Sequence, residues 1–546
     1  MRKKSYIILV GLMSMLLTSC NSLSTDVTTT KRVVPEESIV EETTLKPEDE
    51  TTEIKETETQ EIEKNDELSF MDWKGKREKL GKDILKNETG RRKNFYELNV
   101  DFNDKSSLLD IDQKLIYVND SEDDLNEMYF NIIPNAYSKG YAYNKKDKSA
   151  SDSANDMTCV QSIKIGDKNC KLKRVKGTVY SLLLPEKLRS GDTLEILMKY
   201  KVTIPERQNR FGYYDDEYNV GNFIITPAIY ENGEWACNPY VELGDAFYTE
   251  IADYKVKINV PDEFKVAATG TLEDGTYYAK DVRDFAFFTS NKCEVISDSY
   301  DDIDINVYYP KEHEEGAKEA VICAKKSFEI YNELYGGYPY DDFDITMTAQ
   351  SMGVGGMEYP GLIMISVSED DLEFAKTDKK YYIERMDEVV CHEIAHQWFY
   401  GIVGDDEVNE PWLDESYANF SEKIYFYKSG KKDYDMEKTI DGFMTLFEHS
   451  KEPVGKSEFM SSLYDYNRDK DLLYIAIYIK GGKFHYEMFK QLGEAEYLKC
   501  LKEYIKTFAF DEVTTDEFID FWKEKGDFNK LFKKYLYGNE KVDAMK

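Results

Sequence analysis

Residues 391–415, CHEIAHQWFYGIVGDDEVNEPWLDE, decide how the second half of this chain folds and what chemistry it can support. His392 and His396 are four residues apart, so on a helix their side chains lie on one face, one turn above each other. The two imidazoles can therefore bind one metal ion. Glu415 follows after eighteen residues, on what is expected to be the next helix, and can supply a third ligand.

The donor set of this motif is typical of zinc. Three protein ligands leave the fourth position of a tetrahedral zinc ion for water or substrate. Glu393 is the next residue after His392 on this helix, and its side chain can reach a water molecule bound to the metal ion. Such a string can also be an ordinary amphipathic helix with hydrogen-bonded histidines. We favour the metal site because two of the five histidines in the chain fall in this one motif.

The N-terminus predicts export and a lipid anchor. The chain starts with three basic residues, and an apolar run over residues 6–17 follows that is too short to span a bilayer. We therefore expect a signal peptide over residues 1–19. The sequence LTSC (17–20) resembles a bacterial lipoprotein processing box, which implies cleavage before Cys20 and a lipid on that cysteine. The alternative is a plain secretory signal in which Cys20 is incidental. No later segment is long and apolar enough to span a membrane.

Residues 20–70 are expected to be an unfolded acidic linker. The stretch 21–67 is rich in Thr and Glu and contains no aromatic residue, so it cannot bury enough surface to fold. The whole chain has a formal net charge of −35, which argues against nucleic acid as a partner. The cysteines show no zinc-ribbon or thioredoxin spacing, although Cys159 and Cys170 could close a short loop.

At 546 residues the chain is expected to form two or more domains. Alternating segments such as LEILMKYKVTIP (194–205), bounded by turn residues, predict a β-rich domain over residues 71–300. Residues 301–546 read as a mainly helical domain. Its expected helices include 314–337, 382–401 with the metal motif, and 410–430. Two strands, 343–350 and 362–368, flank a glycine-rich turn.

Four motifs in order resemble the zinc aminopeptidases of the aminopeptidase N and leukotriene hydrolase type. They are GGME (355–358), HEIAHQW (392–398), WLDESYANF (412–420) and YIKGG (478–482), and the resemblance covers roughly residues 90 to 540. It implies an α+β chain, with a β-sheet-rich saddle domain followed by a thermolysin-like, mainly helical catalytic domain. Only 68 residues follow Tyr478, so the large C-terminal helical domain of bigger relatives is expected to be absent.

The resemblance also implies roles for single residues. One Zn2+ would be held by His392, His396 and Glu415, with Glu393 as general base and Tyr478 as stabiliser of the oxyanion. Glu358 would pair with the free α-ammonium group of a peptide, and Gly355, Gly356 and Met357 would line the path of an extended substrate. The chain departs from the family in having Tyr359 where Asn is usual, which leaves the side-chain preference open.

Together these patterns predict a zinc aminopeptidase that acts on peptides with a free N-terminus, outside the cytoplasm on a membrane anchor. Two alternatives stay open. One is an endopeptidase on the same scaffold, and the other is a peptide-binding lipoprotein without activity. The preferred N-terminal residue and the oligomeric state cannot be inferred from the sequence.

Overall fold

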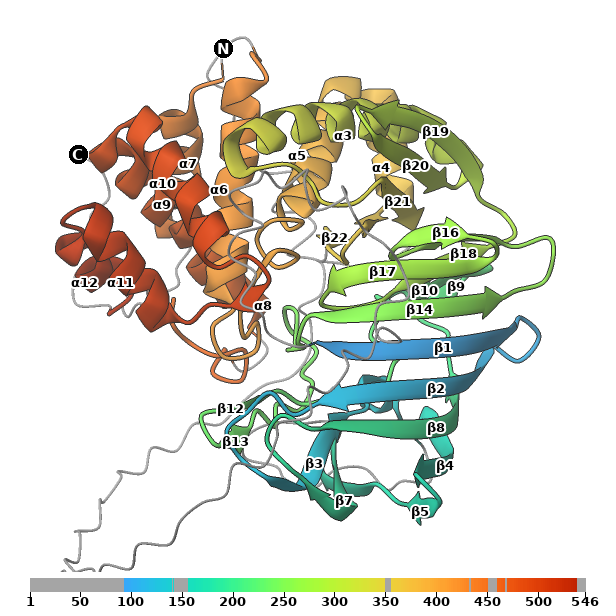
Figure 1. Cartoon of the computed structure of the whole chain (residues 1–546). Helices are drawn as coiled ribbons and strands as arrows, with labels where there is room; N and C mark the ends of the chain where they lie inside the picture. Colours follow the sequence, from blue (N-terminus) through green and yellow to red (C-terminus); the bar gives the residue numbers. More distant parts are fainter. Residues whose placement is uncertain are drawn as a thin grey trace, which may run out of the picture. The chain divides into compact units, whose positions relative to one another are not determined.

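A computed structural model of the chain (Figure 1) describes residues 93–139, 141, 156–348, 355–431, 434–449, 459–466 and 469–537. The predicted signal peptide, Cys20 and the acidic linker lie outside these ranges. The chain divides into two compact units, Met1–Asp72 and Trp73–Lys546, and every described residue belongs to the second. Within the described ranges, no helix has the length and apolar character needed to cross a membrane.

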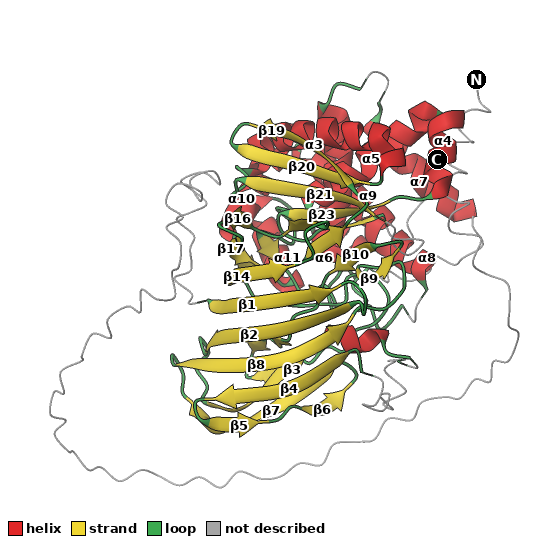
Figure 2. Ribbon diagram, turned by 90° about the vertical axis from the view of Figure 1, so that its right-hand side faces the viewer, coloured by secondary structure: helices red, strands yellow, loops and turns green. Residues whose placement is uncertain are grey.

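The first half of the described chain is built on an eight-stranded sheet (Figure 2). Its strands are antiparallel except that the first, β1, runs parallel to β14. In spatial order the sheet consists of β16 (Thr271–Glu273), β17 (Thr276–Val282), β14 (Ala252–Asn259), β1 (Asn94–Asn103), β2 (Leu108–Val118), β8 (Thr193–Thr203), β4 (Thr158–Ile165) and β5 (Lys168–Cys170).

Strand β8 shows why these segments form a sheet with one buried face. Ile196, Met198 and Tyr200 are buried, whereas the alternate residues Glu195 and Lys199 are exposed. Because successive side chains of a strand point to opposite faces, this alternation places one face against the core and the other in solvent. The strand predicted over residues 194–205 is confirmed.

Two four-stranded sheets pack in the same half and complete its core. The first runs in the order β15 (Lys265–Ala268), β18 (Phe287–Ser290), β10 (Glu217–Val220) and β9 (Phe211–Tyr214). The second consists of β11 (Thr226–Pro227), β3 (Leu125–Asn131), β7 (Val179–Leu188) and β6 (Lys173–Lys176). Smaller elements are η3 (Ile133–Tyr137) and the hairpin of β12 (Tyr230–Glu231) and β13 (Glu234–Trp235).

The second half begins with a five-stranded sheet in the order β19 (Glu294–Tyr300), β20 (Ile303–Tyr309), β21 (Asp342–Thr348), β23 (Leu362–Ser366) and β22 (Gly356–Met357). Strands β20, β21 and β23 are parallel, and β19 pairs with β20 as an antiparallel hairpin. The domain boundary expected at residues 300/301 falls inside this hairpin, and the pairing assigns β19 to the second sheet.

Helices make up most of the remaining chain (Figure 1). Helix α3 (Glu314–Tyr335) packs against β20 and against α5, which carries the metal motif. The described helices after α3 are α4 (Glu369–Thr377), α5 (Lys379–Ala395), α6 (Trp412–Lys428), α7 (Met436–His449), α8 (Lys470–Leu473), η6 (Tyr474–Ile479), α9 (Lys480–Leu492), α10 (Glu494–Thr507), α11 (Thr515–Lys525) and α12 (Asn529–Tyr535). Short elements are η5 (Lys311–His313), β24 (Val403–Gly404) and β25 (Asp511–Glu512).

The predicted extent of the metal helix, 382–401, is wrong in its last turn, because α5 ends at Ala395. The chain then reverses tightly, with the backbone N–H of Gly401 donating to the His396 carbonyl at 2.9 Å. Tyr400 adopts a positive φ of 111° in this reversal. The predicted fold class, a β-sheet-rich region followed by a mainly helical one, is confirmed. In the described part of the chain no large helical domain follows α12.

Arg283, which directly follows β17, ties the two halves together. Its side chain is buried, and Nε donates to the carbonyl of Tyr400 at 2.7 Å. Its terminal nitrogens bind the carbonyl of Asp511 at 2.7 Å and the carboxylate of Glu512 at 2.5 Å. The guanidinium lies flat against Gly404, where an added Cβ would be 2.0 Å from Cζ. A glycine is required at this position because the arginine cannot move without losing these partners.

Replacing Gly404 by alanine should therefore destabilise the fold. We expect the Gly404→Ala variant to lose roughly 1–3 kcal/mol of unfolding free energy through overpacking against Arg283, measured by thermal or urea unfolding. The Gly442→Ala variant is the matched control, since an added Cβ in the middle of α7 meets nothing within 4 Å. That variant should be neutral or up to about 1 kcal/mol more stable. Equal stability of the two variants would contradict the proposed role of Arg283.

Candidate active site

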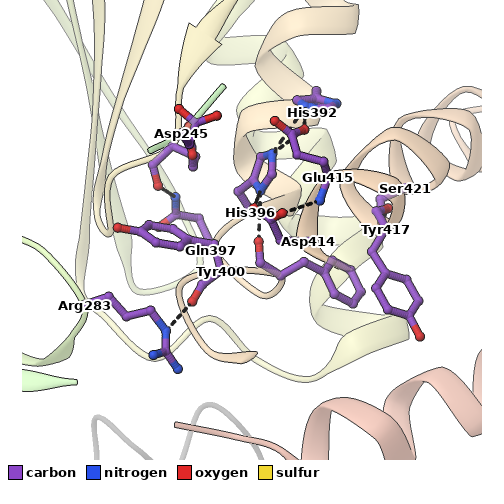
Figure 3. Close-up of polar contacts among 12 residues, drawn as sticks. Asp245, Arg283, His392, His396, Gln397, Tyr400, Asp414, Glu415, Tyr417 and Ser421 are labelled. Carbon is purple, nitrogen blue, oxygen red and sulfur yellow. Dashed lines mark hydrogen bonds and ion pairs between the residues drawn. The ribbon is translucent and has the colours of Figure 1, made fainter. Parts of the chain in front are cut away.

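Three predicted metal ligands meet between α5 and α6 (Figure 3). The Nε2 atoms of His392 and His396 are 3.3 Å apart, and they lie 3.3 and 3.4 Å from Oε2 of Glu415. Ligand atoms bound to tetrahedral zinc at 2.0–2.1 Å are separated by about 3.3–3.4 Å. The three side chains therefore present one face of a tetrahedron of the size that zinc requires.

Neighbouring groups orient these ligands. Nδ1 of His396 donates to the carbonyl of Phe399 at 2.9 Å, so Nε2 keeps its lone pair for a metal (Figure 3). Oδ2 of Asp414 lies 3.5 Å from the same Nδ1. Oδ1 of Asp414 accepts from the backbone N–H of Glu415 at 2.6 Å. Burial alone would raise the pKa of Glu415, but the hydrogen bonds to His392 and His396 outweigh it and hold that pKa below its usual value.

Glu393 lies beside the ligands without belonging to the triangle, and its side chain is buried. Burial raises the pKa of Glu393 to about 8, although the neighbouring His392 opposes the shift. A cation bound by the histidines would lower this pKa again. The carboxylate packs on Gly356, where an added Cβ would lie 2.4 Å from Oε1. The glycine therefore creates the space that Glu393 occupies.

The GGME segment is held beside the metal triangle by the residue that follows the metal motif. Nε2 of Gln397 donates to the carbonyls of Glu358 and Tyr359 at 3.4 and 3.3 Å, and its Oε1 accepts from the N–H of Gly361 at 2.9 Å. Met357 is buried next to Glu358 in β22, whereas Gly355 is exposed. The structure thus brings all four residues of the segment to the edge of the site.

Glu358 and Tyr359 differ in their surroundings. The Glu358 side chain is buried, and its Oε1 has no hydrogen-bond partner. Tyr359 is fully buried, and its hydroxyl donates to Oδ1 of Asn222 in the β-rich half at 3.1 Å. An added Cβ at Gly221 would lie 1.9 Å from this hydroxyl. The tyrosine that replaces the usual Asn therefore fills the core between the halves.

Tyr478 reaches the site from η6, a π-helical segment that continues into α9. Its hydroxyl donates to Oε1 of Glu415. Burial, and then the charge of Glu415, raises the pKa of Tyr478 well above its usual value, so the phenol stays a donor. The glycines after it let α9 approach α6 closely, since an added Cβ at Gly481 would be 2.5 Å from Cβ of Ser416.

The structure also brings in acidic residues that the sequence analysis did not select. Asp245, from the β-rich half, forms a buried ion pair with Arg210 and interacts electrostatically with Glu358 and Tyr478. Additional buried carboxylates are Asp405 and Glu407, from the segment between the two metal helices, and Asp414 in the first turn of α6. The run GDDEVNE (404–410) contains the first two of them. Nothing in this run shows that two of its carboxylates are buried.

Comparisons with known proteins agree with this geometry. Residues 319–535 match the Peptidase family M1 domain. A leukotriene A-4 hydrolase from Xenopus laevis is 26% identical over 227 residues, which cover 40% of this chain and 33% of that protein. An alanine/arginine aminopeptidase from Saccharomyces cerevisiae is 23% identical over 295 residues, which cover 51% of this chain and 32% of that protein. The matched segment thus spans about a third of each of these relatives.

Solved structures show the same fold over a larger part of the chain. An M1 zinc metallopeptidase from Deinococcus radiodurans aligns with a TM-score of 0.57 at 15% identity, covering 83% of this chain and 96% of that chain. A mutant of that protein bound to the peptide Tyr-Ser-Ala aligns with a TM-score of 0.55 at 15% identity, with 83% and 96% covered. The predicted resemblance is confirmed for residues 319–535, which match the Peptidase family M1 domain.

Truncation of Glu415 and truncation of Glu393 should have different effects on zinc affinity. We expect the Glu415→Ala variant to bind zinc at least about 100-fold more weakly, because one of three ligands is lost. The Glu393→Ala variant should keep nearly the affinity of the unaltered protein, since its carboxylate is outside the triangle. Competition with a chromogenic chelator measures both affinities. Equal loss of zinc in the two variants would show that Glu393 is itself a ligand.

Proposed function

Since residues 319–535 form a domain of peptidase family M1, we propose that this protein is a zinc-dependent aminopeptidase that removes residues from the N-termini of peptides. The observation that carries the proposal is the buried carboxylate of Glu358, which is fixed next to the metal triangle with its Oε1 unpartnered. Further support comes from the relatives, among which an aminopeptidase of yeast and a metallopeptidase bound to a tripeptide were found.

The donor set of two imidazoles and one carboxylate fits Zn2+, held by His392, His396 and Glu415. When bound, zinc supplies a Lewis acid that polarises the scissile carbonyl and lowers the pKa of water. Glu393 is placed to take a proton from the attacking water and to return it to the leaving amine. Tyr478 is a protonated donor that can stabilise the oxyanion, a role that typically lowers a barrier by about 3 kcal/mol.

Glu358 selects which bond is cut. A buried carboxylate without a partner is costly, and an α-ammonium group supplies both the missing charge and hydrogen-bond donors. A peptide whose N-terminus binds there presents its first peptide bond to the metal triangle. Asp245 adds negative charge from the β-rich half and strengthens the preference for a cation. A substrate without a free amine would leave Glu358 buried and unpaired, so it is rejected.

Two other functions use the same scaffold. An endopeptidase would need a site that tolerates peptide on both sides of the cut bond, and the buried, unpartnered Glu358 argues against this. A peptide-binding lipoprotein without activity would not need Glu393 to be packed on a glycine or Tyr478 to face Glu415. The presence of a base, a donor and a metal triangle therefore favours a working enzyme.

We also propose that the enzyme is a lipoprotein on the extracytoplasmic face of the cell membrane. The support is the N-terminal sequence alone, with its basic start, its apolar run of twelve residues and Cys20. The acidic stretch that follows would then serve as a tether between the lipid on Cys20 and the folded part of the chain.

A blocked substrate tests the proposed exopeptidase activity. We expect an amino-acid p-nitroanilide to be cleaved and its N-acetylated twin to be left intact, with activity abolished by a chelator. The Glu358→Gln variant should lose at least about 30-fold in kcat/KM on the free amine, the equivalent of ~2 kcal/mol, because a buried charge pair is broken.

Zinc content provides the control for this experiment. The Glu358→Gln variant should bind zinc as the unaltered protein does, because Glu358 is not one of the three ligands in the triangle. Cleavage of both substrates at equal rates would rule out an aminopeptidase. Unchanged kcat/KM in the Glu358→Gln variant would show that another residue binds the amine.

The lipid anchor has its own test. In a bacterial host, the Cys20→Ala variant should shift from the membrane fraction to the soluble fraction, whereas the unaltered protein should incorporate radiolabelled fatty acid. The matched control is Cys159→Ala, which changes a cysteine of strand β4 and should stay with the membrane. Membrane association that survives Cys20→Ala would refute anchoring through this residue.

A further inference from the structure

A second group of carboxylates lies beside the metal triangle and is separate from it. Glu358, Glu407 and Asp414 place one oxygen each so that all three atoms are within 4.8 Å of one another. Glu358 directly follows β22, Glu407 lies in the segment after β24, and Asp414 is in the first turn of α6. All three side chains are buried, with exposed fractions of 4%, 2% and 3%. We call this group the carboxylate cluster.

Two members of the cluster, Glu358 and Glu407, have carboxylate oxygens without a hydrogen-bond partner among the described residues. Both carboxylate oxygens of Glu407 are enclosed without a hydrogen bond, and so is Oε1 of Glu358. Two neighbouring groups in the same segment, the hydroxyl of Tyr400 and Oδ2 of Asp405, are also enclosed and unpartnered. Burying a polar atom without a hydrogen bond costs about 1–3 kcal/mol, and more for a charge. The three unpartnered carboxylate oxygens of Glu358 and Glu407 therefore favour the binding of a cation.

Within the described ranges, no lysine or arginine forms an ion pair with the three carboxylates, and the one histidine near them is His396, 3.5 Å from Asp414. Arg210 is paired with Asp245, and the guanidinium of Arg283 is bound to Tyr400, Asp511 and Glu512. The Nδ1–H of His396 points to the Phe399 carbonyl, and its other nitrogen faces the metal triangle. Burial, and then the charges of Asp414 and Glu358, raises the pKa of Glu407 well above its usual value, as expected for uncompensated charge.

We propose that the carboxylate cluster binds a second, hard divalent cation of the calcium type. Ca2+ takes oxygen ligands at 2.3–2.6 Å, so it can bridge carboxylate oxygens that are up to 4.8 Å apart. The site contains neither nitrogen nor sulfur donors, which zinc and copper prefer. The three carboxylates are at most 4% exposed, and an inorganic ion enclosed by the fold fits this burial.

The cation connects substrate binding with the catalytic metal. It binds one carboxylate oxygen of Glu358, and the other oxygen stays available for the α-ammonium group, a step that rests on the proposed function. It also fixes Asp414, which lies 3.5 Å from Nδ1 of the metal ligand His396. The two ions would therefore have different roles. Zinc would take part in the reaction, and the calcium ion would fix the carboxylates around the zinc site.

Metal content tests the proposal without any measurement of activity. The zinc-loaded full chain is dialysed against CaCl2, washed and analysed by plasma mass spectrometry. We expect one zinc and one calcium per chain, and a rise of a few degrees in Tm on adding CaCl2. The Glu407→Gln variant should keep its zinc, lose at least about tenfold in calcium affinity and show no calcium-dependent rise in Tm.

The Glu410→Gln variant is the matched control. Glu410 lies three residues away, but its carboxylate is satisfied by the backbone N–H of Thr515 at 3.2 and 3.3 Å. This variant should bind calcium as the unaltered protein does. If the unaltered protein binds no calcium and its Tm does not respond to CaCl2, the cluster holds shared protons instead and the proposal is wrong. Calcium binding that survives Glu407→Gln would place the ion elsewhere, and a second zinc in place of calcium would overturn the assignment to a hard cation.

Discussion

The donor atoms of His392, His396 and Glu415 lie 3.3–3.4 Å from one another. The packing of the second half of the molecule depends on this metal triangle. Imidazole and carboxylate side chains are short, so the last turn of α5 must face the first turn of α6 (Figure 3). The tight reversal after His396 makes this possible and also delivers the Phe399 carbonyl to Nδ1 of that histidine. The metal site thus depends on the non-helical backbone that follows His396, although its ligands belong to helices.

Glycines at contact points let the remaining groups reach the metal. Gly356 leaves room for the Glu393 carboxylate, Gly481 brings the helix after Tyr478 against α6, and Gly404 accommodates the guanidinium of Arg283. In each case the nearest atom to an added Cβ would lie at 2.0–2.5 Å, closer than real Cβ contacts. Gly356 of GGME and Gly481 of YIKGG are therefore explained by close approach. A helix or strand bearing any side chain there would be pushed away from the site.

Negative charge concentrated in a buried place determines what this site can bind. The acidity of the chain as a whole, −35, acts mainly at the surface and favours solubility. Inside, the carboxylates of Glu358, Glu393, Glu407, Asp414 and Glu415 are withdrawn from water around the metal position. Such charges persist only when cations accompany them. The catalytic zinc meets this requirement, as would the peptide ammonium group and the calcium ion that we propose.

The sequence by itself determined the metal triangle, the family and the order of a β-rich and a helical half. Helical spacing places His392 and His396 together, and local alternation reveals strands such as β8, so short-range patterns are sufficient for these features. The end of α5 at Ala395, the core position of Tyr359 and the hairpin at residues 294–309 were decided by tertiary contacts. The carboxylate cluster was likewise decided by tertiary contacts. Glu358 and Glu407 are 49 residues apart, and only tertiary packing brings their carboxylates together and removes both from water. Burial is a property of segments packed together, and no single segment of the sequence carries it.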